Sequence, residues 1–121
     1  MAGDPHLIRK KDARKKANQA LKEARKRIKK SEDNDFFREL SRCVKGLIGD
    51  KLNLSTLAFT PAEVNRSLKE KGIPEEIISR TTQFLDELEY CQYVSSGETK
   101  KDRETQYKSA QQLVAQLDKQ L

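Results

Sequence analysis

Apolar residues recur at intervals of three and four along most of the chain, which is the spacing of one face of an α-helix. The first such segment, residues 4–30, begins at Asp4-Pro5, a capping acid followed by a proline at the first helical position. Most of its apolar positions are alanine, and only Leu21 and Ile28 are large. We therefore expect the second half of this helix to dock on the rest of the protein, and the first half to stay in solvent or fray.

A polar turn at residues 31–35 separates this helix from the next one. Its aspartates place negative charge at the start of the second helix, where the helix dipole favours it. The second helix carries the strongest apolar stripe of the chain: Phe36, Phe37, Leu40, Val44, Leu47, Ile48 and Leu52. A helix that carries this stripe, from Phe36 to Leu52, is predicted.

Three more helices follow. Thr60-Pro61-Ala62-Glu63 is a capping box, which predicts a short helix that ends at Gly72 in a left-handed Schellman turn closed by Ile73. Pro74 then opens a helix that continues to Cys91, and residues 102–121 form the last one. No segment has the alternating pattern of a strand.

The fold class predicted by these elements is all-α: a compact bundle of about five helices with a long basic N-terminal helix. Residues 1–30 form the basic helix and residues 31–121 the bundle, within one domain overall. The predicted core consists of Phe36, Phe37, Leu40, Val44, Leu47, Leu68, Ile77, Ile78, Phe84, Leu85, Leu88, Leu113 and Leu117.

Composition agrees with a small helical domain, and charge divides it in two. The 121 residues are 35% hydrophobic and 36% charged, with no tryptophan and few glycines, which disfavours a β-sandwich. Residues 9–30 hold 12 Lys/Arg and 2 acids, whereas residues 31–121 hold 13 basic and 16 acidic residues. A basic arm is thus attached to a mildly acidic body, and this asymmetry needs an explanation.

The residues offer little for catalysis. Two cysteines, Cys43 and Cys91, lie far apart among helix-periodic apolar residues, and the single histidine is near the chain start, which disfavours zinc or a Cys–His nucleophile. We interpret both cysteines as small buried hydrophobes. The glycines are isolated, so no phosphate-binding loop is present. We expect no enzyme activity, no cofactor, no metal and no small-molecule substrate.

Nucleic-acid binding is the alternative function. Residues 60–92 resemble a helix-turn-helix unit, and the basic run could neutralise phosphates. However, the second helix of that unit has five acids against the single Arg80, and no aromatic residue is interleaved with the basic run for base stacking. Phosphates would repel a recognition helix of this sign. We expect no nucleic acid as partner, and keep this function as the alternative.

A juxtamembrane helix and a plain solvated helix both explain the basic run. Lys/Arg clusters on the cytoplasmic flank of a membrane span follow the positive-inside rule and are attracted to anionic headgroups. The predicted membrane-facing residues are Arg9, Lys10, Lys11, Arg14, Lys15 and Lys16. An Ala/Lys/Arg helix is also often simply solvated, and composition leaves these two alternatives open. No stretch approaches the ~18 apolar residues of a membrane span, so the chain is expected to be soluble.

Three consecutive segments of the chain resemble the cytoplasmic C-terminal domain of proteins of the BatD family. These are membrane-anchored bacterial aerotolerance (oxygen-tolerance) proteins. The segments are "ARKKANQALKEARKRIKK", "DFFRELSRCVKGLIGDKLNL" and "FTPAEVNRSLKEKGIPEEIISRTTQFLDELEYCQYV", and the resemblance extends over nearly the whole chain, to residue 121. It implies a helical tail on the cytoplasmic side of the inner membrane. It also implies partners among MoxR-type AAA+ ATPases and von Willebrand factor A domain proteins in stress tolerance. None of the segments is a catalytic motif, so no functional residue is carried over.

The sequence therefore predicts a non-catalytic protein-interaction domain at the cytoplasmic face of the bacterial inner membrane. The predicted partner surface is the acidic helix of residues 75–92, with Glu75, Glu76, Glu87 and Glu89, which would meet a basic surface on the ATPase. The basic helix is interpreted as a stop-transfer flank that has been extended into a helix, with an anionic membrane surface as a possible second contact.

Overall fold

The computed structural model describes residues 5–28, 35–54, 60–93 and 100–121, and these ranges contain five helices and no strand. The helices are α1 (Pro5–Arg25), α2 (Asp35–Leu52), α3 (Pro61–Glu70), α4 (Glu75–Tyr93) and α5 (Lys100–Gln120). The prediction of a compact all-α bundle of about five helices is confirmed. The predicted Asp4 cap and most of the turn at 31–35 lie outside the described residues.

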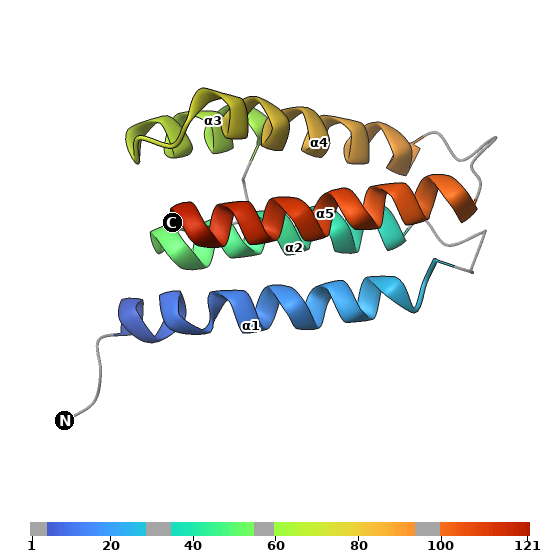
Figure 1. The fold of residues 1–121 in the computed structure, drawn as a ribbon, viewed down its shortest axis with the longest axis horizontal. Coiled ribbons are helices and arrows are strands. Elements are labelled where there is room, and N and C mark those ends of the chain that lie inside the picture. Colours follow the sequence, from blue (N-terminus) through green and yellow to red (C-terminus); the bar gives the residue numbers. More distant parts are fainter. Residues whose placement is uncertain (1–4, 29–34, 55–59, 94–99) are drawn as a thin grey trace.

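The helices form three layers (Figure 1). α1 is one outer layer, α2 and α5 form the middle, and α4 with α3 forms the other outer layer. α2 packs against α1, α4 and α5, while α3 packs on α4, and α5 also contacts α1. The start of α1 and the ends of α2 and α5 lie at the same end of the bundle, at the left of Figure 1. Neighbours α1 and α2 are therefore antiparallel, as are α4 and α5.

The core lies between these layers and follows the predicted apolar stripes. Of the predicted core residues, all are buried except Ile77, which is only half-buried at the edge of the cluster. The remaining buried apolar side chains are Ala13, Ala17, Leu21, Ala24, Ile28, Cys43, Ile48, Val64, Ile73, Ala110 and Val114. Helical periodicity was thus a reliable guide to the inward face of every helix.

The first half of α1 is docked, and the prediction that it stays in solvent is wrong. Ala13 is 0% exposed and Ala17 is 3% exposed. The thiol of Cys43 on α2 donates a hydrogen bond to the carbonyl oxygen of Ala17 at 3.2 Å, so the two backbones approach closely. Small side chains permit this approach, and the contact buries backbone and methyl surface where large apolar residues are missing.

α1 also ends earlier than expected, at Arg25 rather than about Lys30. A turn over residues 26–28 follows, in which the Arg27 amide donates to the Ala24 carbonyl at 2.9 Å. Ile28 remains buried, so the turn carries the chain back onto the core.

The Thr60 cap and the Gly72 turn of α3 are as the sequence predicts. The Thr60 hydroxyl accepts a hydrogen bond from the Glu63 amide at 3.2 Å, and Pro61 occupies the first turn. At the other end Gly72 has φ +73°, and the Ile73 amide donates to the Leu68 carbonyl at 3.1 Å, which is the closing bond of a Schellman turn. This turn reverses the chain so that α4 packs against α3.

Candidate functional site

The outer side of α4 carries the predicted partner surface. Glu75, Glu76, Glu87 and Glu89 are all exposed, as expected. The first two lie in the first turn of the helix, where the dipole favours acids. The others lie eleven to fourteen residues further on, or roughly 17 to 21 Å along the axis at about 1.5 Å per residue. The structure therefore places the four glutamates in two pairs, near the two ends of α4.

Two further residues belong to this surface, and sequence reasoning missed both. Asp86 is exposed beside Glu87, and Tyr90 is 67% exposed one turn later. We call Asp86, Glu87, Glu89 and Tyr90 the acidic face of α4. Gln83, Glu87 and Tyr90 are spaced by four and three residues, and positions at this spacing share one side of a helix. This spacing is a sequence signal that Tyr90 lies on the same exposed side as Glu87.

A groove of about 300 Å³ lies between α4 and α5 beside this face. Its walls include Phe84 and Leu113, and its rim includes Glu87 and Arg80. Arg80 crosses to α5, where it donates a hydrogen bond to the Gln116 side-chain oxygen at 3.0 Å. The groove is shallow and mostly polar, and it adjoins the acidic face at Glu87.

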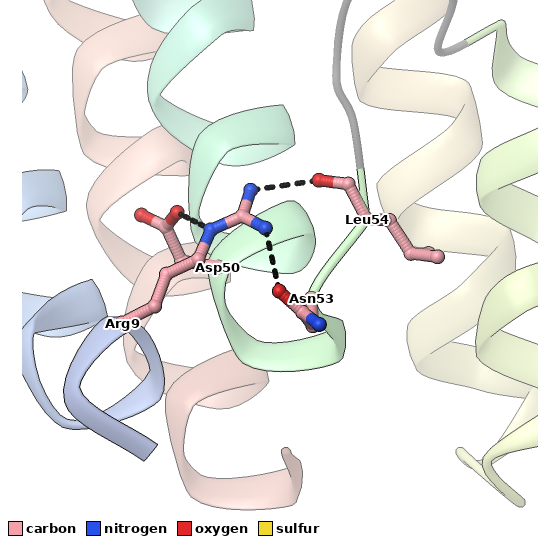
Figure 2. Close-up of polar contacts among 4 residues, drawn as sticks. All are labelled: Arg9, Asp50, Asn53 and Leu54. Atoms are coloured by element: carbon pink, nitrogen blue, oxygen red, sulfur yellow. Dashed lines mark hydrogen bonds and ion pairs between the residues drawn. The ribbon is translucent and has the colours of Figure 1, made fainter. Parts of the chain in front are cut away.

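The basic residues at the start of α1 divide into two groups, and Arg9 belongs to the inward one. Its guanidinium donates three hydrogen bonds at the C-terminal end of α2 (Figure 2): to the Asp50 carboxylate at 2.7 Å, the Asn53 side-chain oxygen at 3.0 Å and the Leu54 carbonyl at 2.7 Å. Asn53 has φ +56°, which turns the chain out of the helix. The positive charge of Arg9 is also favourable here, because the C-terminal end of a helix carries the negative end of its dipole. Arg9 thus fastens α1 to α2 and does not point away from the bundle.

Arg14 is the second inward residue. It donates to the Asp118 carboxylate on α5 at 3.1 Å, and the Lys51 ammonium of α2 reaches the same carboxylate at 2.7 Å. Asp118 therefore joins three helices. The hydrogen bond from Lys51, with the smaller contributions of Arg14, lowers the pKa of this carboxyl against the opposing effect of its partial burial.

Asp118→Asn is expected to destabilise the fold by about 1 kcal/mol at neutral pH, because half-buried Lys51 loses its ionic partner. The folded-state pKa of Asp118 is lowered, so its contribution is complete above the ordinary carboxyl pKa, about pH 4. The contribution is then lost as the pH falls through the folded-state pKa. Urea titrations at several pH values test this: the difference between parent and variant should shrink below about pH 4, whereas exposed Asp86→Asn should show almost no difference at any pH.

Lys10, Lys11, Lys15 and Lys16 form the outward group and are exposed. Of the six predicted membrane-facing residues, the structure therefore exposes these four, whereas the side chains of Arg9 and Arg14, 31% and 40% exposed, contact α2 and α5. The partners of both arginines are distant in sequence, so no local pattern could have identified them.

Arg103 on α5 is a buried charged residue that the sequence did not reveal. It is 1% exposed, and its guanidinium donates to the Arg27 carbonyl at 3.0 Å, just after the end of α1. The same group lies 5.7 Å from the ring centroids of both Phe36 and Phe37, which pack edge to face at 5.2 Å. Arg103 thus connects the start of α5 to the turn after α1 at one end of the bundle, and Arg9 connects the start of α1 to the end of α2 at the opposite end.

Cys43 is a structural residue. Burial raises the pKa of its thiol to about 12, and the nearby Glu39 carboxylate adds to the shift. The thiol therefore stays protonated at neutral pH and is a poor nucleophile. The prediction of a small buried hydrophobe is confirmed for Cys43, whereas Cys91 is half-buried.

Within the described residues, no group of three or more His, Cys, Asp or Glu side chains is arranged to hold a metal ion. In the same part of the chain, no helix has both the length and the apolar character needed to cross a bilayer. Comparisons with protein-family models, with curated proteins and with solved structures found no match for this chain.

Proposed function

We propose that this chain is a non-catalytic protein-interaction domain that binds a basic protein surface through the acidic face of α4. The observation that carries the proposal is that Asp86, Glu87 and Glu89 are all exposed on α4 together with Tyr90, which is 67% exposed. In the wider setting, we propose that it is the cytoplasmic tail of a membrane-anchored BatD-like aerotolerance protein. Its partners would then be MoxR-type AAA+ ATPases and von Willebrand factor A domain proteins.

The packing beneath α4 supports this role. The inward side chains Phe84, Leu85 and Leu88 are buried, so the helix presents its outer side as a rigid surface. Exposed acids steer a basic partner and select against acidic ones, and they contribute more to association rate and specificity than to affinity. An exposed tyrosine supplies apolar contact area with little loss of side-chain entropy, which is why tyrosine is enriched among residues that dominate binding.

A binding assay with charge-reversal variants tests the proposal. Purified MoxR-type and von Willebrand factor A partners from the same genome are passed over the immobilised domain. Asp86→Lys/Glu87→Lys and Tyr90→Ala should each weaken binding at least about tenfold, in the range of residues central to an interface. Glu70→Lys/Glu104→Lys is the matched control. It reverses the charge of two exposed acids on α3 and α5, so its net charge changes as much as in the Asp86/Glu87 variant, and it should leave binding unchanged.

A separate variant, Glu75→Lys/Glu76→Lys, measures how far the contact extends toward the start of α4. If the Asp86/Glu87 and Tyr90 variants capture both partners as well as the parent does, the acidic face is not the contact. If neither partner binds the parent domain in low salt, the proposed partners are wrong.

A further inference from the structure

The outer side of α1 carries a row of lysines. Lys11, Lys15 and Lys22 are exposed and are spaced by four and seven residues, so they share one side of the helix. Lys26, in the turn after α1, is also exposed and continues the row. We call these four residues the lysine stripe. It lies on the side of α1 opposite to the buried alanines, and so faces away from α2 and α5.

Two large apolar side chains stand at the start of this stripe. Leu7 is 61% exposed and Ile8 is 51% exposed, and with Tyr90 they are the large hydrophobic residues that the described part of the chain exposes. By helical spacing they flank the line of Lys11 and Lys15, one on each side. Apolar side chains next to a row of lysines are typical of a helix that lies in the interface of a membrane.

We infer that the lysine stripe, with Leu7 and Ile8, binds the surface of an anionic lipid bilayer, with α1 lying along the membrane plane. The lysine stems lie over the acyl boundary while their ammonium groups reach the headgroups. Leu7 and Ile8 enter the headgroup layer. The inference deepens the proposed function, on which it rests, because it names the membrane-side ligand and the contacting residues.

The arginines favour a lipid surface over a specific phosphate site. A guanidinium presents a rigid fork of donors that matches a single phosphate, whereas an ammonium acts as a point charge. Of the three arginines of α1, Arg9 and Arg14 contact the ends of α2 and α5, and only Arg25 in the last turn is exposed, so lysines predominate on the outward side. Such a row fits the diffuse negative potential of a membrane better than it fits the fixed phosphates of a nucleic acid.

The acids of α1 leave the stripe accessible. Asp12 and Glu23 are exposed at its edge, and Glu23 pairs with Lys26 at 3.2 Å. Both side chains of this pair are more than half exposed, at 63% and 65%. An exposed pair of this kind is weak, so Lys26 can turn toward a more negative surface.

The layers of the bundle fit this orientation. α1 and α4 lie on opposite sides of the layer formed by α2 and α5 (Figure 1). A domain bound through α1 therefore holds the acidic face of α4 away from the lipid, where repulsion between the acids and the headgroups is small. The same orientation leaves that face open to a protein partner.

Vesicle co-sedimentation of the full chain tests the inference. Vesicles of phosphatidylcholine with phosphatidylserine should retain the domain at low salt, and vesicles of phosphatidylcholine alone should not. Lys11→Gln/Lys15→Gln/Lys22→Gln should lower the partition coefficient roughly a hundredfold, since each lysine contributes about fivefold at an anionic surface. Lys69→Gln/Lys71→Gln/Lys119→Gln is the matched control, with the same change of net charge at the end of α3, at its C-cap and on α5, and should bind nearly as the parent does.

A tryptophan reporter tests the orientation, because the chain has no tryptophan. The fluorescence of an Ile8→Trp variant should shift to shorter wavelength on anionic vesicles, whereas that of Tyr90→Trp should not shift. Three results would each overturn the inference: equal retention on neutral and anionic vesicles, an equal loss of vesicle binding in the two triple-lysine variants, or an unshifted Ile8→Trp spectrum. So would binding of duplex DNA or single-stranded RNA through the same lysines at the strength measured for the vesicles.

The two proposals fail separately. Loss of vesicle binding with intact capture of the protein partners overturns only the lipid contact. Intact vesicle binding with no capture of the partners overturns only the protein contact.

Discussion

Replacing Arg103 by alanine is expected to lower the free energy of unfolding by about 3 kcal/mol, the largest single effect expected here. The substitution empties a fully buried site and removes the guanidinium that lies 5.7 Å from the Phe36 and Phe37 rings. It also removes the donor to the Arg27 carbonyl, a partly buried hydrogen bond in the turn after α1. Lost packing and a lost hydrogen bond therefore add.

Urea denaturation followed by circular dichroism measures this effect, with a fall in melting temperature of about 10 °C as the thermal counterpart. Arg103→Met is the matched comparison, because methionine refills much of the volume without the charge or the donors. It should recover roughly half of the loss. If the free energies of unfolding of Arg103→Ala and the parent differ by less than about 1 kcal/mol, Arg103 does not stabilise this end of the bundle.

Ala13→Leu is expected to destabilise the fold by about 2 kcal/mol, because the larger side chain would overpack a fully buried site. Ala13 is 0% exposed on the face of α1 that meets the bundle. If this half of the helix were solvated, leucine would be nearly neutral, since alanine and leucine have similar helix propensities. The sign and size of the effect thus report directly on whether the start of α1 is docked.

The same substitution at Gln19, which is exposed on the outer side of α1, is the control and should change stability by less than about 0.5 kcal/mol. Hydrogen exchange adds local information: in Ala13→Leu the amides of α1 should lose protection more than those of α4. Equal stability of the Ala13 and Gln19 variants would contradict the docked arrangement of α1.

The helices and their inward faces could be predicted because large apolar residues at helical spacing report burial without knowledge of the partner. The Thr60 cap and the Gly72 turn could be predicted because their chemistry is local. The docking of Ala13 and Ala17 could not, since alanine is as common on solvated helices as on closely packed ones. Which of the two applies depends on the facing helix, and here the facing surface near Cys43 is close enough to bury both.

The candidate site was predicted in part for a related reason. Exposure of the α4 glutamates follows from their position opposite the apolar stripe. The roles of Arg9, Arg14 and Arg103 depend on partners 41, 104 and 76 residues away. Charge patterns along the chain carry no information about such pairs, so the sequence predicts all six basic residues at the start of α1 to face outward, although Arg9 and Arg14 contact other helices.

The Arg14–Asp118 contact has a consequence for the order of folding. Neighbouring helices α1 and α2 pair through contacts of moderate sequence separation, so their hairpin can form early. Asp118 meets Arg14 across 104 residues, near the end of the last helix, and this loop closes only when α5 settles between α1 and α4. An interaction formed after the rate-limiting step slows unfolding and leaves folding almost unchanged. The Asp118 contact would then form late in folding and lengthen the lifetime of the folded domain by lowering its unfolding rate.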